Sequence, residues 1–78
     1  MMHYMQHYAA RNGHANICEL LLRNGAHANT VTRTGHVSAL HRAAYSGHGD
    51  VIQLLLKFGA LTSLCDADGK TALHKVNC

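Results

Sequence analysis

The sequence predicts an all-α fold, a solenoid of helix–turn–helix units joined by short β-turn loops, and three observations carry that prediction. A shift of 34 positions aligns residues 7–26 with residues 41–60, and ten of these twenty pairs are identical. Six of the seven glycines recur in matching pairs, at positions 13 and 47, 25 and 59, and 35 and 69. Apolar residues recur with helical spacing in each copy. A repeat of this period indicates stacked units, each burying its apolar face on the next.

The first helix of the second unit is expected over residues 39–46. Ser38 precedes it and is a favoured N-cap residue, because its hydroxyl accepts a hydrogen bond from a backbone N–H in the first turn. Gly47 follows, and glycine readily adopts the left-handed backbone that ends a helix. In the first unit Gly13 occupies the matching position. The sequence therefore predicts a short helix before each of these two glycines.

A second helix is expected after each of these glycines. In the second unit Asp50 is available as its N-cap, and Gly59 ends it. The apolar residues between them follow an i, i+1, i+4, i+5 pattern that places them on one face, which neighbouring elements must cover. They are Val51, Ile52, Leu55 and Leu56, matched in the first unit by Ile17, Cys18, Leu21 and Leu22, with Asn16 as the corresponding cap and Gly25 as the end.

Polar loops divide the chain into three repeats. Residues 29–37 and 63–70 contain Arg-Thr-Gly and Asp-Ala-Asp-Gly, which suit tight turns. One extra residue near His36 precedes the second opening motif, because residues 38–41 align with residues 71–74 only at a shift of 33. We therefore predict an irregular first repeat over 1–29, a second repeat over 30–63 and a partial third repeat over 64–78.

Two segments resemble the opening motif of ankyrin repeats. They read Ser-Ala-Leu-His-Arg-Ala-Ala at 38–44 and Thr-Ala-Leu-His at 71–74, with alanine where that family usually has proline. The segments at 17–26 and 51–60 resemble the closing part of the family's unit, so the resemblance covers nearly the whole chain. It implies a protein-interaction module in which His7, His41 and His74 bridge each turn to a neighbouring unit. It also implies that Asn29 occupies a position hydroxylated in some family members.

Both ends depart from the repeat pattern. Residues 1–6 replace the expected turn and opening motif, so that His7 is the first residue in register. The third unit stops within its first helix, at residues 76–78. Arrays usually need three or more repeats and polar caps for stability. We therefore expect an isoform, a fragment or a truncated product that is marginally folded alone. Little independent function is then the alternative to partner binding.

The composition argues against several other classes of protein. The basic residues that give the formal charge of +3 are spaced along the chain, which disfavours nucleic acid as a partner. No apolar run is long enough to span a membrane, and the N-terminus lacks the pattern of a secretory signal. The three cysteines are an odd number at irregular spacing. Reduced thiols and a cytoplasmic or nuclear location are therefore expected.

Eight histidines raise the alternative of a metal-binding protein, with His3, His7 and His14 as candidate zinc ligands. Five of the eight, however, occupy two recurring positions: His7, His41 and His74, and His14 and His48. A catalytic pair of Cys18 and His14 is disfavoured, because Cys18 falls on the apolar stripe and buried thiols are inert. We therefore predict no enzyme, no bound metal and no cofactor.

The resemblance implies a protein partner on the concave face and the turn tips of the array. Late in the first helices the candidate residues are Arg11, Asn12, Tyr45 and Ser46. At the turn tips they are Arg33, Thr34, His36, Val37, Ala67, Asp68 and Lys70. Arg11, Arg33 and Tyr45 come first, because Arg and Tyr are enriched in interface hot spots. We expect weak binding and a monomer, unless oligomerisation compensates for the short array.

Overall fold

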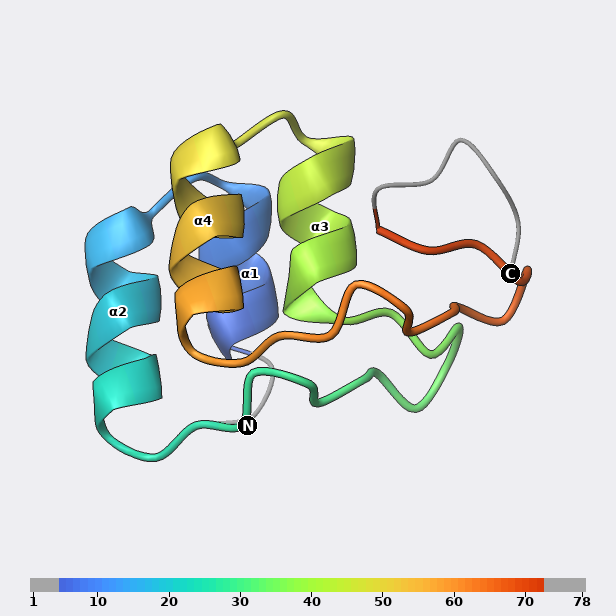
Figure 1. Cartoon of the computed structure of the whole chain (residues 1–78), viewed down its shortest axis with the longest axis horizontal. Helices are drawn as coiled ribbons and strands as arrows, with labels where there is room; N and C mark the ends of the chain where they lie inside the picture. The colour runs from blue at the N-terminus through green and yellow to red at the C-terminus, as the bar shows by residue number, and fades with distance from the viewer. Residues whose placement is uncertain (1–4, 73–78) are drawn as a thin grey trace.

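The computed structural model describes residues 5–72, and within them the chain forms four short α-helices in two hairpins (Figure 1). The first hairpin consists of α1 (Met5–Arg11) and α2 (Ala15–Arg23), and the second of α3 (Ala39–Tyr45) and α4 (Gly49–Lys57). Helix α1 packs against α3, and α2 packs against α4. The structure is thus an all-α stack of helix–turn–helix units, as the sequence predicted.

The core lies between the two hairpins and contains many small side chains. Small residues let helices approach closely, and four alanines of α1 and α3 are almost fully buried: Ala9, Ala10, Ala39 and Ala43. The buried residues of α2 and α4 are larger: Cys18, Leu22, Val51 and Leu55. The predicted apolar stripe is only partly covered, since Ile17 and Leu56 are 43% and 39% exposed.

The start of α3 has the predicted N-cap. The Ser38 hydroxyl accepts a hydrogen bond from the backbone N–H of His41 (3.2 Å), and the His41 ring accepts one from the Ser38 N–H in return. In the first unit the helix begins at Met5, the position equivalent to Ala39. The expectation that the repeat register begins only at His7 is therefore wrong. Helix α1 thus includes Met5 and Gln6, and the side chain of Gln6 lies in the core, with 1% of its surface exposed.

The second helix of each unit begins differently from the prediction. Their N-cap residues are His14 and His48, and neither forms a side-chain capping hydrogen bond. Asp50 is instead the second residue of α4, and its carboxylate accepts a hydrogen bond from the N–H of Val51 (2.9 Å). Asn16 is likewise the second residue of α2. Both capping predictions are wrong, although a carboxylate in the first turn still stabilises α4 through the helix dipole.

The two inter-repeat loops close with the same kind of hydrogen bond. The N–H of Thr32 donates to the carbonyl of Val37, and the N–H of Asp66 donates to the carbonyl of Lys70, each at 2.9 Å. The first loop is one residue longer between these partners, which accounts for the change of the repeat offset from 34 to 33. The longer loop contains a left-handed residue other than glycine, His36 (φ 50°).

We expect the substitution His36→Gly to stabilise the chain by up to about 1 kcal/mol. A residue with a Cβ loses roughly 1–2 kcal/mol in the left-handed region. Glycine avoids this strain, although its greater freedom in the unfolded chain offsets part of the gain. Urea unfolding followed by circular dichroism measures the change, with His27→Gly as a control at another exposed loop histidine. A lower free energy of unfolding for His36→Gly than for the wild type would show that the left-handed backbone at His36 is not strained.

Candidate protein-binding surface

The two inter-repeat loops lie side by side along one edge of the helix stack (Figure 1). At their tips, the backbone N–H of Ala67 in the second loop donates to the carbonyl of Gly35 in the first (2.8 Å). The base of the first loop is closed by an antiparallel bridge between Val31 and Ser38. The turn tips therefore form one continuous edge instead of two independent loops.

Two buried histidines attach this edge to the helices. His7 of α1 directs Nε2 at the carbonyl oxygens of Thr30 (3.1 Å) and Val37 (3.0 Å), and His41 of α3 directs Nε2 at that of Lys70 (2.9 Å). Carbonyl oxygens only accept, so Nε2 carries the proton and donates in both rings. This use of Nε2 leaves His7 poorly suited to the alternative role of zinc ligand. The remaining position of the series, His74, lies outside the described residues, as does the candidate ligand His3.

Asn29 adds a second link, from the start of the first loop to the chain just after α4, which could not be foreseen from the sequence. Its amide nitrogen donates to the carbonyl of Gly59 (3.1 Å), and its amide oxygen accepts from the N–H of Leu61 (2.7 Å). The second repeat has Ser63 at the equivalent position, so no second copy of this residue signals the link. Hydroxylation of Asn29, which the resemblance raised, stays a prediction.

The candidate contact residues at the helix ends are exposed. Arg11 and Tyr45 are the last residues of α1 and α3, and Asn12 and Ser46 follow them directly. Tyr45 is 54% exposed, and its hydroxyl donates a long hydrogen bond to the carboxylate of Asp66 in the second loop (3.5 Å). This contact joins the end of α3 to the turn tips.

Most of the candidate residues at the turn tips are exposed as well. Val37 is half-buried, whereas the others are exposed: Arg33, Thr34, His36, Ala67, Asp68 and Lys70. Asp66 was not among the candidates, but its carboxylate accepts from the N–H groups of Asp68 (2.9 Å) and Lys70 (3.0 Å) and so shapes the second tip. These bonds, chiefly that from Lys70, hold the pKa of the Asp66 carboxyl below its usual value. The turn sequence Asp-Ala-Asp-Gly could have indicated this role of Asp66, because an Asp side chain commonly accepts a hydrogen bond from the backbone N–H two residues on.

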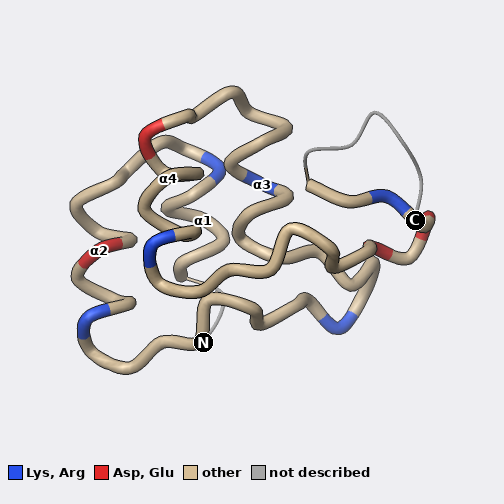
Figure 2. The backbone as a smooth tube through the Cα atoms, in the orientation of Figure 1, with Lys and Arg blue, Asp and Glu red and all other residues tan. Residues whose placement is uncertain are grey.

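A hollow of about 230 Å³ lies where α1, α3 and the first loop meet. Its lining consists of His7, Tyr8, Arg11, Thr32 and Arg42. Two arginines that line one hollow favour a carboxylate, because guanidinium groups bind it through paired N–H donors. Other basic residues are dispersed along the chain (Figure 2), and Arg23 is paired with Glu19 (2.7 Å). Arg42 is a residue of this surface that the sequence analysis missed.

The cysteines offer no activated nucleophile among the described residues. Cys18 is fully buried, and burial together with the charge of Asp50 raises the pKa of its thiol to about 11. It is therefore protonated and unreactive near neutral pH. Cys65 is disulfide-bonded, so the expectation of reduced thiols is wrong for this residue.

Within residues 5–72, no three side chains of His, Cys, Asp or Glu lie close enough together to hold a metal ion. Over the same residues, no helix has both the length and the apolar character needed to cross a membrane.

Stacked helix hairpins, joined by an edge of hydrogen-bonded turns, define a helical repeat protein of the solenoid class. The chain belongs to the ankyrin-repeat family, because the family model described as ankyrin repeats, in three copies, matches residues 6–76. Ankyrin repeats are generally protein-interaction modules, and the match indicates no catalytic family. A comparison with curated proteins finds no match.

Proposed function

We propose that this chain binds a protein partner through its concave face and turn tips. The observation that carries the proposal is the hydrogen bond between Ala67 and Gly35, because it joins the two tips into one ordered edge beside the exposed helix ends. An ordered surface loses little conformational entropy on binding. The general role of ankyrin repeats in protein interaction supports the same conclusion.

The partner proposed for this surface presents an acidic side chain next to an apolar one. The acidic group fits the hollow lined by Arg11 and Arg42, and the apolar group packs on the exposed ring of Tyr45. Two repeats offer less than the roughly 800 Å² that each partner buries in a standard interface. Binding is therefore weak and depends on a few residues, foremost Arg11, Arg33 and Tyr45.

The test is a double substitution, Arg33→Ala with Tyr45→Ala, in the immobilised full chain. Proteins that the wild type retains from a cell extract are expected to be lost, while helix content by circular dichroism is unchanged. The matched control is Asn16→Ala with Gln53→Ala, because both residues are exposed on the second helices. If the double variant retains the same proteins as the control, the assignment of this surface is wrong.

We also propose a relationship to a particular member of the family, and a cellular location. The segments 7–14 and 39–48, with the extra residue before Ser38, resemble ankyrin repeat domain-containing protein 39, a small intracellular member of the family. The division into units at 1–29, 30–63 and 64–78 and the cytoplasmic or nuclear location belong to this proposal. The free, buried thiol of Cys18 is consistent with that location, whereas the disulfide bond of Cys65 is unusual in it.

A further inference from the structure

Equivalent positions on the first helices of the two units carry the same two residue types in exchanged order. Tyr8 and Arg11 of α1 correspond, at the repeat shift of 34, to Arg42 and Tyr45 of α3. Because α1 packs against α3, equivalent positions are neighbours, so each arginine stands opposite a tyrosine of the other helix. We name these four residues the Arg–Tyr set. Its two tyrosines are 65% and 54% exposed, so the set presents aromatic rings and cationic groups on one surface.

The hollow of about 230 Å³ lies within the Arg–Tyr set, and two neighbouring units and the loop between them form its walls. His7 and the hydroxyl of Thr32 lie in the wall, but both already bind backbone groups of the first loop. The polar side-chain groups that remain for a ligand are the Tyr8 hydroxyl and the guanidinium groups of Arg11 and Arg42. All three can donate hydrogen bonds, and no carboxylate lines the hollow.

The two arginines of the hollow carry positive charge that the described part of the chain does not neutralise. Within residues 5–72, neither guanidinium forms an ion pair, whereas Arg23 pairs with Glu19 at 2.7 Å. Arg42 stays partly exposed although α1 packs against its helix, so a unit stacked in front of this position does not close it. A ligand in the hollow therefore meets two unpaired positive charges.

Two positive charges favour a doubly charged anion over a single carboxylate. A carboxylate has one negative charge and neutralises one of the two arginines. The phosphate of a phosphorylated side chain carries a charge of about −1.5 to −2 near neutral pH and has three strong acceptor oxygens. Each guanidinium binds such oxygens through paired N–H donors, and the Tyr8 hydroxyl can donate one more hydrogen bond. The donors and the charge of the hollow thus match a phosphate monoester.

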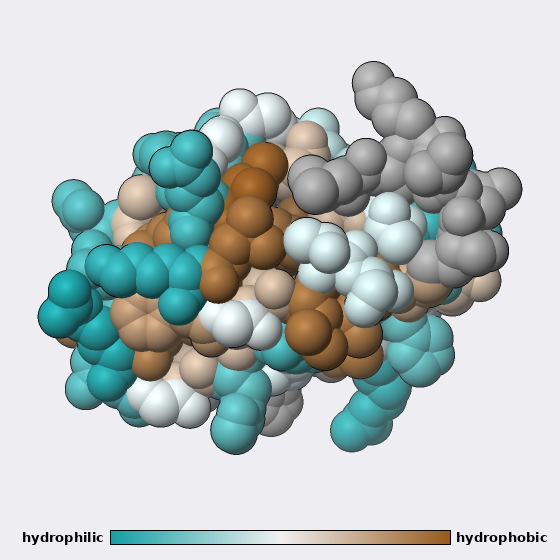
Figure 3. Space-filling view, viewed as in Figure 1, coloured by the Kyte–Doolittle hydropathy of each residue, from teal (hydrophilic) through white to brown (hydrophobic). Residues whose placement is uncertain are grey.

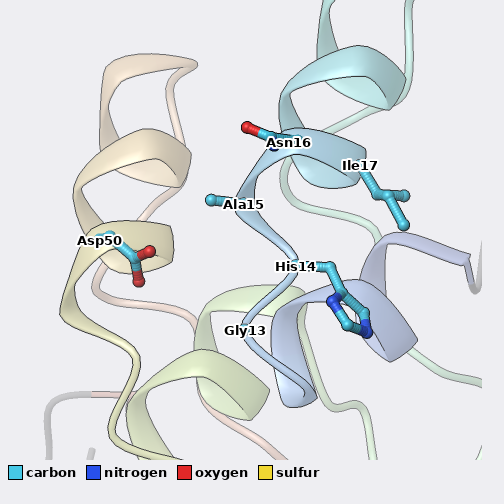
Figure 4. A pocket seen from close by; sticks show the side chains of 6 residues that line it. All are labelled: Gly13, His14, Ala15, Asn16, Ile17 and Asp50. Atoms are coloured by element: carbon cyan, nitrogen blue, oxygen red, sulfur yellow. The ribbon is translucent and has the colours of Figure 1, made fainter.

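Other parts of the described surface suit an anion less well. A pocket of about 440 Å³ lies between the starts of α2 and α4 (Figure 4), but the carboxylate of Asp50 lines it and would repel an anion. His14 lines the same pocket, and its side chain points away from Asp50 in Figure 4. On the side seen in Figure 3, a hydrophobic strip lies over α4, and such a surface favours apolar groups over charged ones. The hollow is therefore the better site for a phosphate.

We propose that the hollow binds the phosphate of a phosphorylated serine or threonine, so that this chain recognises its partner only after the partner is phosphorylated. The inference rests on the proposed partner binding and identifies the acidic side chain in it. A phosphorylated serine or threonine side chain is short and keeps the partner's backbone close to the helices. Its neighbours then reach the exposed ring of Tyr45, from which a longer phosphotyrosine side chain would hold them away.

The spacing within the Arg–Tyr set also places the apolar residue of the partner. Tyr45 follows Arg42 by three positions on α3, and this spacing separates the Cβ atoms on a helix by about 5–6 Å. In an extended segment, alternate side chains point to the same side and lie about 6–7 Å apart. The apolar side chain is therefore expected two residues from the phosphorylated one.

Fluorescence anisotropy of three labelled peptide pools with the full chain tests the proposal. The pools have phosphoserine, serine or glutamate at one fixed position, leucine two residues before and after it, and random residues elsewhere. The phosphoserine pool is expected to bind at least about tenfold more tightly than the serine pool, because it gains charge-assisted hydrogen bonds. The glutamate pool is expected to lie between them. Equal binding of the phosphoserine pool and either other pool, or no binding of it, overturns the proposal.

Substitutions in the hollow show whether the phosphate lies there. Arg42→Gln is expected to weaken binding of the phosphoserine pool about tenfold, with a smaller effect on the glutamate pool, which needs one arginine. The matched control Lys57→Gln removes the same charge at an exposed position of α4 and is expected to bind like the wild type. Circular dichroism confirms that each variant is folded, and Arg11→Gln replaces Arg42→Gln if the latter unfolds. Equal binding by the hollow variant and Lys57→Gln would contradict the proposal.

Phosphatase treatment separates this proposal from the proposed function. Proteins that the wild type retains from a cell extract are expected to be lost when the extract is first treated with a phosphatase. If they are still retained, the requirement for phosphate is wrong, whereas the proposed partner binding stands. If the double variant of Arg33 and Tyr45 retains the same proteins as its control, the proposed function fails, and this proposal with it. Displacement of the phosphoserine pool by an equal concentration of inorganic phosphate, or tighter binding of a single-stranded RNA, would indicate an unspecific anion site and overturn the proposal.

Discussion

Replacement of His41 by alanine is expected to lower the free energy of unfolding by about 3–5 kcal/mol. The imidazole is fully buried, and both of its nitrogens bind backbone groups. Nδ1 accepts from the N–H of Ser38 (3.2 Å), and Nε2 donates to the carbonyl of Lys70 (2.9 Å). Each buried backbone group that loses its partner costs about 1–3 kcal/mol, and the cavity left by the ring adds to this. The substitution therefore loosens the second loop and the start of α3 together.

A loss of this size is large for a chain of 78 residues. Domains of this length have free energies of unfolding of about 4–12 kcal/mol, and 1 kcal/mol corresponds to roughly 4–8 °C in the midpoint of thermal unfolding. We expect the midpoint to fall by more than about 10 °C for His41→Ala, measured by circular dichroism. The control His27→Ala removes an exposed imidazole and is expected to change it little. Equal midpoints for the two variants would show that the His41 bridges contribute no net stability.

The helices and their ends could be predicted from the sequence where the signal is local. Ser38 caps α3 through a residue three positions away, and Gly47 adopts the left-handed backbone of a helix end through its own lack of a Cβ. The repeat doubled these signals, since residues 7–26 have counterparts 34 positions later and residues 38–41 have counterparts 33 positions later. The positions of the four helices followed from such short-range chemistry.

What the sequence could not show depends on contacts between distant segments. Gln6 is buried although its equivalent is a leucine, and its amide nitrogen donates to the carbonyl of His27 (2.6 Å). The N-cap assignments failed for a related reason. The second helices begin at His14 and His48 without side-chain capping bonds, and His48 is instead directed at Arg11 in the neighbouring unit. A residue's preference for caps does not reveal such a distant partner.

The candidate binding surface was predictable in position but not in organisation. Arg33 and Tyr45 are polar or amphipathic residues at a turn and a helix end, so their exposure followed from the repeat register. The hydrogen bond from Ala67 to Gly35 joins two main-chain groups 32 residues apart. Such a bond depends on backbone position and leaves no trace in residue type. The inclusion of Arg42 in the hollow likewise depends on how α1 lies against α3.

The exchange of Gly13 for alanine is expected to be the second most damaging substitution, lowering the free energy of unfolding by about 2–4 kcal/mol. A Cβ at φ 74° is strained by roughly 1–2 kcal/mol. It would also stand 2.8 Å from two ring atoms of His48, a distance that no Cβ contact sustains. The ring must turn away and give up its hydrogen bond to the Arg11 carbonyl, which adds about 1 kcal/mol or more.

Gly47→Ala is a matched control for this prediction, because it separates the strain of the backbone from the collision. Its φ is 78°, close to that of Gly13, but no described atom lies near the added Cβ. Urea unfolding is expected to show a loss of only about 1–2 kcal/mol for Gly47→Ala.

Combining Gly13→Ala with His48→Ala removes the collision, so the penalty of Gly13→Ala should then fall to that of Gly47→Ala. The cycle thereby measures the coupling that the contact of His48 with Gly13 and with the Arg11 carbonyl contributes between the two units. Equal losses for Gly13→Ala and Gly47→Ala, in the presence of His48, would show that the contact carries no coupling. In that case the stacking of the units would rest on the buried apolar residues of the core alone.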